Sequence, residues 1–599
     1  MTMAEALVRF LAAQETDGGE PLFAGVWAIF GHGNVAGLGP ALHAARRKLP
    51  TLRAHNEQAM AHAAIAFAKA HARRRMMACT TSIGPGASNM VTAAALAHVN
   101  RLPVLLLPGD IFASRRPDPV LQQLEHFGEP GLSVNDCFRP VSRYFDRIMR
   151  PEQLLVSLPA ALRVLLDPAD CGPATVALPQ DVQTEAFDYP AEFFRRRVHR
   201  VRRPLPDAAE LQAAAALLRR AKKPLVIAGG GVKYALAEKR LAAFAEKRGI
   251  PVAETQAGKG SLAWDHACNA GAIGVTGTSA ANTLAARADV VLAIGARLGD
   301  FATGSRALFG GAKLIQLNVA AFDAAKHGAV SLVADADAGL EALDRELEGW
   351  RAPGGWIQEA QRLTAAWHRA LGRITAPGGK PTDAQVLAAV NAALEKKPHI
   401  MVCAAGGLPG ELHKLWRATD SVSYHLEYGY SCMGYEIAGG LGAKLAHPGR
   451  QVCVMVGDGS YLMLNSEIAT SVALDAKLTI VLLDNRGFGC IQRLQAATGG
   501  APFNNLLDDD APRVDFVAHA RSLGAQAEKA DLKGLPAALE RALRARKTAV
   551  IVIDTDPQRG TAEGGAWWDV AVTQAPRSAG QKKARAAYER ARRKQALGA

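Results

Sequence analysis

Two side chains with oxygen ligands stand 27 residues apart, each at the end of an apolar run. Asp458 follows Val452–Val456, and Asn485 follows Leu478–Leu483. Runs of this length predict strands that are buried in a parallel sheet. Apolar residues at four-residue spacing predict one helix between them. The carboxyl ends of two such strands lie on one edge of a sheet, where α/β proteins bind ligands. A carboxylate and an amide oxygen there suit Mg²⁺ or Ca²⁺.

Two glycines flank the aspartate, in Gly457-Asp458-Gly459. Glycines at a strand end let backbone N–H groups approach a phosphate, and the N-terminus of the following helix adds positive potential. A Gly-Asp-Gly sequence alone is often only a turn. The same sequence followed by an asparagine at the end of the next strand is far more specific.

The combined pattern resembles the metal–diphosphate motif of the thiamine diphosphate enzymes. In that family the Asp, the Asn and a backbone carbonyl two residues later hold the metal, which assigns Asp458, Asn485 and Gly487 here. The family often has a second Asn directly after the first, where this chain has Arg486. That second Asn is not a side-chain metal ligand, so the departure leaves the resemblance intact. The resemblance implies thiamine diphosphate and Mg²⁺ as cofactors.

Three domains must position these residues. The chain has 599 residues, and 49% of them are hydrophobic, which supports several large cores. Strands alternate with glycine-rich turns and helices, which predicts an α/β fold of three αβ domains with parallel sheets. In the family these are the pyrimidine-binding, central and diphosphate-binding domains. We expect them at 1–190, 205–348 and 380–574, with linkers at 190–206 and 350–380 and a basic tail at 575–599.

We expect the first and third domains to share a topology, although no sequence repeat is visible. The central domain carries Gly229-Gly230-Gly231 after its first strand, Pro224–Ala228. Three glycines there resemble a nucleotide-binding turn, but the full GxGxxG pattern is missing. We therefore expect a structural middle domain, with a bound nucleotide as the alternative.

The net charge of +14 raises the question of nucleic-acid binding. Residues 195–203 and the tail segment 577–594 carry 13 of those 14 charges. A basic linker and a basic tail are typical of solvated surface. We expect no nucleic-acid partner, and RNA binding by the tail is the alternative.

Cysteines and apolar runs indicate the compartment. The eight cysteines form no CxxC pair, which argues against a structural zinc site and a secreted disulfide framework. The N-terminus lacks the basic region and apolar core of a signal peptide. No apolar run reaches 18 residues, so we expect no membrane span and a cytoplasmic protein.

Glu57 is the expected catalytic residue. Thiamine diphosphate needs a carboxylate beside N1′ of its aminopyrimidine, because this favours the tautomer that removes the C2 proton and forms the ylide. The resemblance assigns that role to Glu57, which follows the second strand of the first domain. A lone Glu at a helix start is otherwise a capping residue. Its occurrence together with Asp458 and Asn485 favours the catalytic role.

The resemblance also implies contacts to the rest of the cofactor. Met433 matches the bulky apolar residue that props the cofactor in its bent shape, with an ordinary core methionine as the alternative. Ser431 would offer its carbonyl to the 4′-amino group. The remaining candidate contacts, near the diphosphate, are Gly406, Gly407, Gly457, Gly459 and Ser460.

An assembly follows from the same resemblance. In the family the cofactor lies between the first domain of one subunit and the third domain of another. Glu57 and Asp458 belong to those two domains. We therefore expect a homodimer, or a homotetramer built as a dimer of dimers, with each active site between subunits.

Three longer stretches narrow the resemblance to one branch. Residues 24–39, 56–70 and 563–572 are similar to the trihydroxycyclohexane-dione hydrolases of myo-inositol breakdown. That branch implies hydrolytic ring opening of a cyclic 1,2-dione to 5-deoxy-D-glucuronate through the ylide. A polyhydroxy substrate needs polar side chains near the cofactor. His32 and Asn34 are the first candidates. Gln123 and His126 come next.

Two other functions remain open. An acetolactate synthase-type carboligase, or another thiamine diphosphate enzyme acting on 2-keto acids, would share the three domains, the glutamate and the metal motif. A regulatory subunit without catalysis would bind the cofactor but is expected to lack Glu57 or a metal ligand. Both are present.

Overall fold

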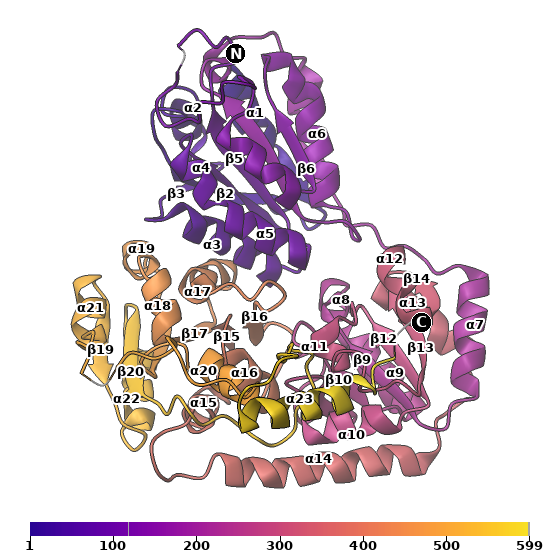
Figure 1. Cartoon of the computed structure of the whole chain (residues 1–599). Helices are drawn as coiled ribbons and strands as arrows, with labels where there is room; N and C mark the ends of the chain where they lie inside the picture. Colours follow the sequence, from indigo (N-terminus) through magenta and orange to yellow (C-terminus); the bar gives the residue numbers. More distant parts are fainter. Residues whose placement is uncertain (118, 509, 597–599) are drawn as a thin grey trace. The chain divides into compact units, whose positions relative to one another are not determined.

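Three six-stranded sheets, each with all its strands parallel, organise the chain. The computed structural model describes residues 1–117, 119–508 and 510–596 (Figure 1). The chain forms two compact units. The first consists of Met1–Arg202, Gly434–Gly449 and Leu464–Leu478, and the second holds the rest of the described chain. The α/β fold is confirmed, and the domain boundaries stay predictions.

The first unit contains a sheet of strand order β3-β2-β4-β5-β7-β6. Apolar side chains of α1 (Met3–Ala12), α2 (Leu38–Ala45) and α6 (Leu154–Leu165) form the core on one face. Helices α3 (Glu57–Ala70) and α5 (Val91–Asn100) cover the other face (Figure 1). The strands are β2 (Phe23–Ile29), β3 (Thr51–Leu52), β4 (Met76–Thr81), β5 (Val104–Asp110), β6 (Tyr144–Arg147) and β7 (Pro173–Pro179).

Helix α3 also packs closely on α17 (Tyr435–Ala446) within the first unit. A Cβ on Gly442 would lie 2.1 Å from the carbonyl oxygen of Ala63, so only glycine allows this approach. Ala59 and Ala438 meet in the same small core. Small residues thus let the two helix backbones come near each other, which explains why α17 groups with the first unit.

The second unit contains the central sheet, of order β11-β10-β9-β12-β13-β14. Its triple glycine has a packing role. A Cβ on Gly229 or Gly231 would lie 2.3 or 2.6 Å from the backbone of Gly295, and the Gly231 N–H donates to the Gly295 carbonyl at 3.0 Å. The structural interpretation therefore fits these glycines. The strands are β9 (Pro224–Ala228), β10 (Val252–Glu254), β11 (Asn269–Ala272), β12 (Val290–Ile294), β13 (Lys313–Asn318) and β14 (Val330–Val333).

The third sheet, also in the second unit, has the order β16-β15-β17-β18-β20-β19. Helices α15 (Asp383–Leu394), α16 (Leu408–Leu415) and α22 (Leu535–Arg544) build the core on one face (Figure 1). The strands are β15 (His399–Cys403), β16 (Tyr424–Leu426), β17 (Gln451–Gly457), β18 (Thr479–Asp484), β19 (Gln526–Lys529) and β20 (Ala549–Asp554).

The expected second linker, 350–380, is mostly helical. Helix α14 (Gly354–Ile374) places Trp356 in the core of the central sheet and Trp367 in the core of the third. The Trp356 indole N–H donates to the Pro224 carbonyl at 2.8 Å. Pro353 is the N-cap of this helix, Gly354 and Gly355 are its first two residues, and the second Pro-Gly stretch follows its end. Its apolar residues at helical spacing were the missed signal.

The basic tail forms helix α23 (Ala579–Arg592), which has no buried residue. The Arg585 guanidinium donates to the Val572 carbonyl at 2.9 Å, and the Gln595 amide donates to the Ser305 carbonyl at 3.0 Å. The tail is thus attached to the second unit. No helix in the described part of the chain is long and apolar enough to cross a membrane.

Candidate active site

Three loops meet at the carboxyl edge of the third sheet. They follow β15, β17 and β18, which are neighbours in the sheet. The chain returns from edge strand β16 to β17 on the other side of β15, so the strand order reverses between β15 and β17. Such a reversal opens a crevice for ligands. Gly406 and Gly407 stand on one side of it, with Asp458 and Asn485 on the other.

Asp458 begins helix α18 (Asp458–Met463) directly after β17. The Asn485 backbone N–H donates to the Asp458 Oδ1 at 3.3 Å, so the two predicted ligands lie side by side. The prediction of one helix between the strands was wrong. Helix α18 ends at Met463, and α19 (Glu467–Ala473) begins after a break. Asn and Ser in that break favour local hydrogen bonds over helix.

The charge of Asp458 is poorly compensated. Burial, together with the nearby Asp484 carboxylate, raises the pKa of Asp458 to about 6. The backbone N–H groups of Asn485 and Gly487 act against this rise. A cation would stabilise the ionised carboxylate at such a position.

Asn485 and Gly487 complete the oxygen set. The Asn485 Oδ1 is buried and has no hydrogen-bond partner within the described residues. Gly487 has φ of +140°, and a Cβ there would lie 2.4 Å from the Asn505 carbonyl oxygen. Only glycine fits. A Cβ on Gly459 would lie 3.5 Å from the Gly487 carbonyl oxygen, which places that oxygen beside the Asp458 turn.

These residues fit the predicted metal. A buried amide oxygen without a donor and a buried carboxylate lie together, and both are ligands that Mg²⁺ prefers. Among the described residues no group of three or more His, Cys, Asp or Glu side chains could hold an ion. The three oxygens assigned to this chain would leave open positions in the octahedral shell of Mg²⁺, which a second molecule such as a diphosphate would fill.

Arg486 occupies the position where the family often has asparagine. Its backbone has φ of +64°, a conformation that asparagine tolerates better than most residues. The Arg486 N–H donates to the Asp484 carboxylate at 3.0 Å, and its guanidinium donates to the Ala511 carbonyl at 3.3 Å. The residue thus fixes the loop and leaves the ligand positions unchanged.

The diphosphate candidates surround the same edge. Gly406 has φ of +87°, and Gly407 is the N-cap of α16, whose first N–H groups have no partner in their own helix. A Cβ on Gly457 would meet nothing within 4 Å, so a ligand can approach its backbone. Ser460 is buried in the first turn of α18, and a Cβ on Gly459 would lie 2.6 Å from the Phe488 ring.

Sequence reasoning missed Arg493, on α20 (Gly489–Ala497). A Cβ on Gly407 would lie 2.7 Å from its Nη2, and its Nη1 donates to the Pro557 carbonyl at 2.7 Å. A guanidinium therefore stands beside a loop predicted to bind diphosphate. No local motif marks this residue, because only tertiary packing brings it there.

Ser431 and Met433 lie on the loop that follows β16. Ser431 is exposed and has φ of +46°, while Met433 is half-buried. The Tyr430 N–H donates to the buried Glu427 carboxylate at 3.1 Å, which holds the loop. Their contacts to a cofactor stay predictions.

Glu57 is the first residue of α3, in the first unit. Asn56 caps this helix by accepting from the Ala59 N–H at 3.1 Å, so Glu57 is free of the capping role. The Asn89 amide donates to the Glu57 Oε2 at 2.9 Å. A Cβ on Gly86 would lie 3.1 Å from Oε1. The short helix α4 (Pro85–Asn89), which follows β4, thus orients the carboxylate. Asn89 is a second residue that sequence reasoning did not assign.

The two first substrate candidates differ in their surroundings. His32 is exposed on the loop after β2. Asn34 is only 1% exposed. Its amide donates to the Thr80 hydroxyl at 3.1 Å and the Thr81 carbonyl at 2.8 Å, and its Oδ1 accepts from the Gly31 N–H at 3.1 Å. Asn34 therefore shapes the loop that presents His32.

Gln123 and His126 lie in a long segment without helix or strand, between β5 and the 3-10 helix η1 (Val134–Val141). The Gln123 Oε1 accepts from the Val134 N–H at 3.4 Å, and its buried Nε2 has no partner in the described part of the chain. His126 is exposed. The neighbouring residue Gln122 covers Gly84, whose Cβ would lie 1.8 Å from the Gln122 carbonyl oxygen.

Comparisons with known proteins agree with this geometry. Three family models of thiamine pyrophosphate enzymes match the chain. The N-terminal TPP binding domain matches residues 1–128, the central domain 211–343 and the C-terminal TPP binding domain 404–553. Glu57 lies in the first match and Asp458 in the last.

Curated relatives match over nearly the whole length. A protein of Geobacillus thermodenitrificans is 45% identical, with 96% of each chain covered. A protein of Bacillus anthracis is 44% identical, with 98% of this chain and 97% of the relative covered. Both are named 3D-(3,5/4)-trihydroxycyclohexane-1,2-dione hydrolase. The chain belongs to the thiamine pyrophosphate enzymes and, within them, to the family of these hydrolases.

Proposed function

We propose that this enzyme opens the ring of 3D-(3,5/4)-trihydroxycyclohexane-1,2-dione by hydrolysis and releases 5-deoxy-D-glucuronate. The observation that carries the proposal is the presence of Glu57, Asp458 and Asn485 in a chain that is 45% identical to a named hydrolase. Asp458 and Asn485 adjoin each other at a ligand crevice, and Glu57 begins a helix that Asn56 caps.

The chain's own residues have distinct tasks in this reaction. Bound thiamine diphosphate supplies a carbon nucleophile that attacks a carbonyl of the dione. The Glu57 carboxylate would hold the proton at N1′ of the aminopyrimidine ring, and Asn89 keeps that carboxylate oriented through its 2.9 Å hydrogen bond. His32 would bind a substrate hydroxyl at the exposed loop after β2.

The metal proposed for this site is Mg²⁺. Asp458, the Asn485 side chain and the Gly487 carbonyl would hold it. The metal would neutralise the diphosphate and complete the charge balance of the buried Asp458. Arg493 would add positive charge from the side of Gly407.

We further propose a homodimer or a dimer of dimers, with Glu57 of one subunit serving the metal edge of another. The support is the family resemblance of the first and third domains. The proposed setting is myo-inositol breakdown in the cytoplasm. Nucleic-acid binding is not part of the proposal.

A product assay tests this function. The purified enzyme would receive thiamine diphosphate and Mg²⁺ with the cyclic dione in one arm and pyruvate in the other. We expect 5-deoxyglucuronate in the first arm only, dependent on the cofactor. Acetolactate from pyruvate with the dione untouched would instead favour a carboligase. Calorimetric titration of thiamine diphosphate with and without Mg²⁺ gives a readout that does not depend on the substrate.

A further inference from the structure

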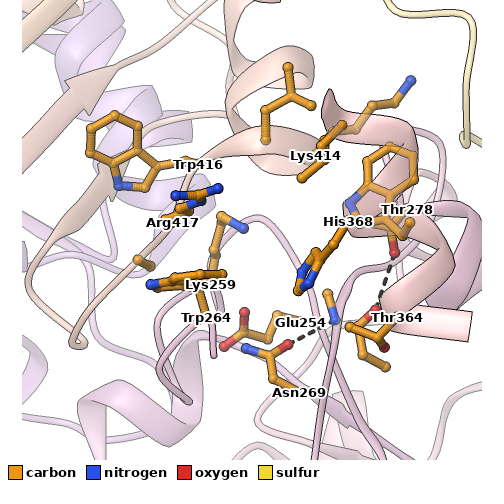
Figure 2. A pocket seen from close by; sticks show the side chains of 16 residues that line it. Glu254, Lys259, Trp264, Asn269, Thr278, Thr364, His368, Lys414, Trp416 and Arg417 are labelled. Atoms are coloured by element: carbon orange, nitrogen blue, oxygen red, sulfur yellow. Dashed lines mark hydrogen bonds between the residues drawn. The ribbon is translucent and has the colours of Figure 1, made fainter. Parts of the chain in front are cut away.

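A separate cavity lies within the second unit, between the edge of the central sheet and the chain that leaves α16 (Figure 2). The end of β10, the beginning of β11 and one face of α14 form its walls. Its volume is about 40 Å³. On that measure one water takes roughly 10–15 Å³, so the cavity has room for a group the size of a small oxyanion.

The charge of the lining is mostly positive. Lys259, Lys414 and Arg417 line the cavity, and Glu254 is the one carboxylate among its lining residues. His368 also lines it, but burial and the nearby Arg417 lower the pKa of His368, so its imidazole adds no positive charge. Two of the cations already have partners. The Lys414 ammonium donates to the carbonyls of Thr561 and Glu563, each at 3.0 Å. Arg417 pairs with the Glu395 carboxylate at 3.3 Å.

Lys259 differs from these two. Its side chain is buried, with 5% of the residue exposed. Its ammonium donates no hydrogen bond to any residue in 1–117, 119–508 or 510–596, and its nearest aromatic contact is the Tyr424 ring at 5.9 Å. Burial lowers the pKa of Lys259, and the Glu254 charge opposes that shift. An ammonium that lines a cavity and has no protein acceptor can form a charge-assisted hydrogen bond with a ligand oxygen.

The Glu254 carboxylate binds backbone groups of the same loop. Its Oε1 accepts from the N–H groups of Gly260 at 3.1 Å and Leu262 at 3.0 Å. The carboxylate thus fixes the loop that carries Lys259. No salt bridge within 4.0 Å joins the two side chains in the described structure.

We propose that this cavity is a binding site for a small oxyanion, a carboxylate or a phosphate, held by the Lys259 ammonium. Figure 2 shows Lys259, Trp264, His368 and Arg417 turned toward one space. The Arg417 guanidinium lies 4.5 Å from the centre of the Trp264 ring, which is within the range of a cation–π contact. This pair forms the more exposed wall of the cavity.

The site joins two parts of the second unit. The Trp264 backbone N–H donates to the Ala418 carbonyl at 2.9 Å, which links the Lys259 loop to the segment after α16. A bound anion would bridge Lys259 and Arg417, which come from these two segments. Binding is therefore expected to raise the melting temperature. This inference does not rest on the proposed catalytic function.

Tryptophan fluorescence tests the site, because three of the chain's eight tryptophans line it: Trp264, Trp367 and Trp416. The full-length enzyme with thiamine diphosphate and Mg²⁺ would be titrated with sodium acetate, and separately with sodium phosphate, at ionic strength held constant with NaCl. We expect a saturable signal with at least one probe. Acetate alone would indicate a carboxylate ligand, and phosphate alone a phosphate.

Two lysine variants localise the signal. Lys259→Met should weaken binding of the effective probe at least tenfold. The matched control Lys247→Met removes an exposed lysine that pairs with Asp344 at 2.7 Å in the same domain, and it should bind as wild type. If Lys259→Met does not fold, Arg417→Gln takes its place, with a threefold or larger weakening expected. The absence of a saturable signal with either probe, or full affinity in the decisive variant, would overturn the proposal.

Discussion

The first and third sheets share one strand order but carry different chemistry. Numbered within its own sheet, each runs 2-1-3-4-6-5. In the first sheet a carboxylate, Glu57, begins the helix after the second strand. In the third sheet the corresponding loop carries Ser431, and the carboxylate, Asp458, follows the third strand instead. The frame therefore repeats, and the loops decide whether an edge provides a base or a metal ligand.

The central sheet sharpens this contrast. Its order is 3-2-1-4-5-6, which also reverses at a crevice. The glycines at that reversal pack against the backbone of Gly295. A crevice alone is thus no site, because the residues around it must also leave space and offer ligands.

The largest expected effect comes from Asp458→Asn at the third-sheet edge. This change removes the carboxylate of the predicted metal set, so cofactor and metal should no longer bind, and turnover should fall about 1,000-fold or more. Calorimetry with thiamine diphosphate and Mg²⁺ measures the loss directly.

Asp484→Asn is the matched control for that variant. Asp484 raises the pKa of Asp458 but is not a predicted ligand. Its replacement should leave cofactor binding within about tenfold of wild type. Equal losses in the two variants would mean that the assignment of ligands along this edge is mistaken.

Glu57→Gln should distinguish the role of the first-sheet edge in turnover from the role of the third-sheet edge in cofactor binding. Glutamine keeps the size of the side chain and can accept from Asn89, but it cannot hold the N1′ proton in the same way. We expect turnover to fall by roughly 10²–10⁴. Cofactor affinity should remain within a few-fold of wild type, as measured by calorimetry. Wild-type rates in this variant would refute the proposed role.

A mixture of the two inactive variants tests whether the edges cooperate between subunits. If Glu57 and Asp458 of one site come from different chains, each heterodimer of Glu57→Gln with Asp458→Asn contains one intact site. Random reassociation should then restore about a quarter of wild-type activity. The variants would be unfolded, mixed and refolded together, with separate refolding as the control. No recovery, despite mixed dimers found by mass spectrometry, would place both residues in one chain.

The central strands of the fold could be predicted from sequence, whereas most of the edge strands could not. Pro224–Ala228 was predicted with the bounds that the structure shows. This strand lies inside its sheet, is buried along its whole length and reads as a continuous apolar run. The missed strands β6, β11, β14, β16 and β19 all lie at sheet edges. In β6 no residue is fully buried, and in β19 only Ala527 is, so the sequence there shows no apolar run.

The candidate site divides in the same way. Asp458 and Asn485 could be predicted because two neighbouring parallel strands must end on the same edge. Arg493 and Asn89 reach the predicted sites only through tertiary packing, beside Gly407 and Glu57. Local sequence patterns do not indicate such long-range contacts.

The smallest effects are expected at the edge of the first sheet, where replacing Asn34 should lower stability and replacing His32 should raise KM. Asn34→Ala removes three hydrogen bonds and leaves buried groups unsatisfied, which should destabilise the fold by about 1–3 kcal/mol and lower the melting temperature. His32→Ala changes an exposed side chain, so the melting temperature should stay the same while KM for the dione rises roughly tenfold. Steady-state kinetics and thermal melts on both variants distinguish the two roles.

An unchanged KM in His32→Ala would remove His32 from the substrate site, because no other task for that side chain is visible in the loop. A raised KM with a normal melting temperature in Asn34→Ala would show that the loop conformation, more than the histidine itself, selects the substrate.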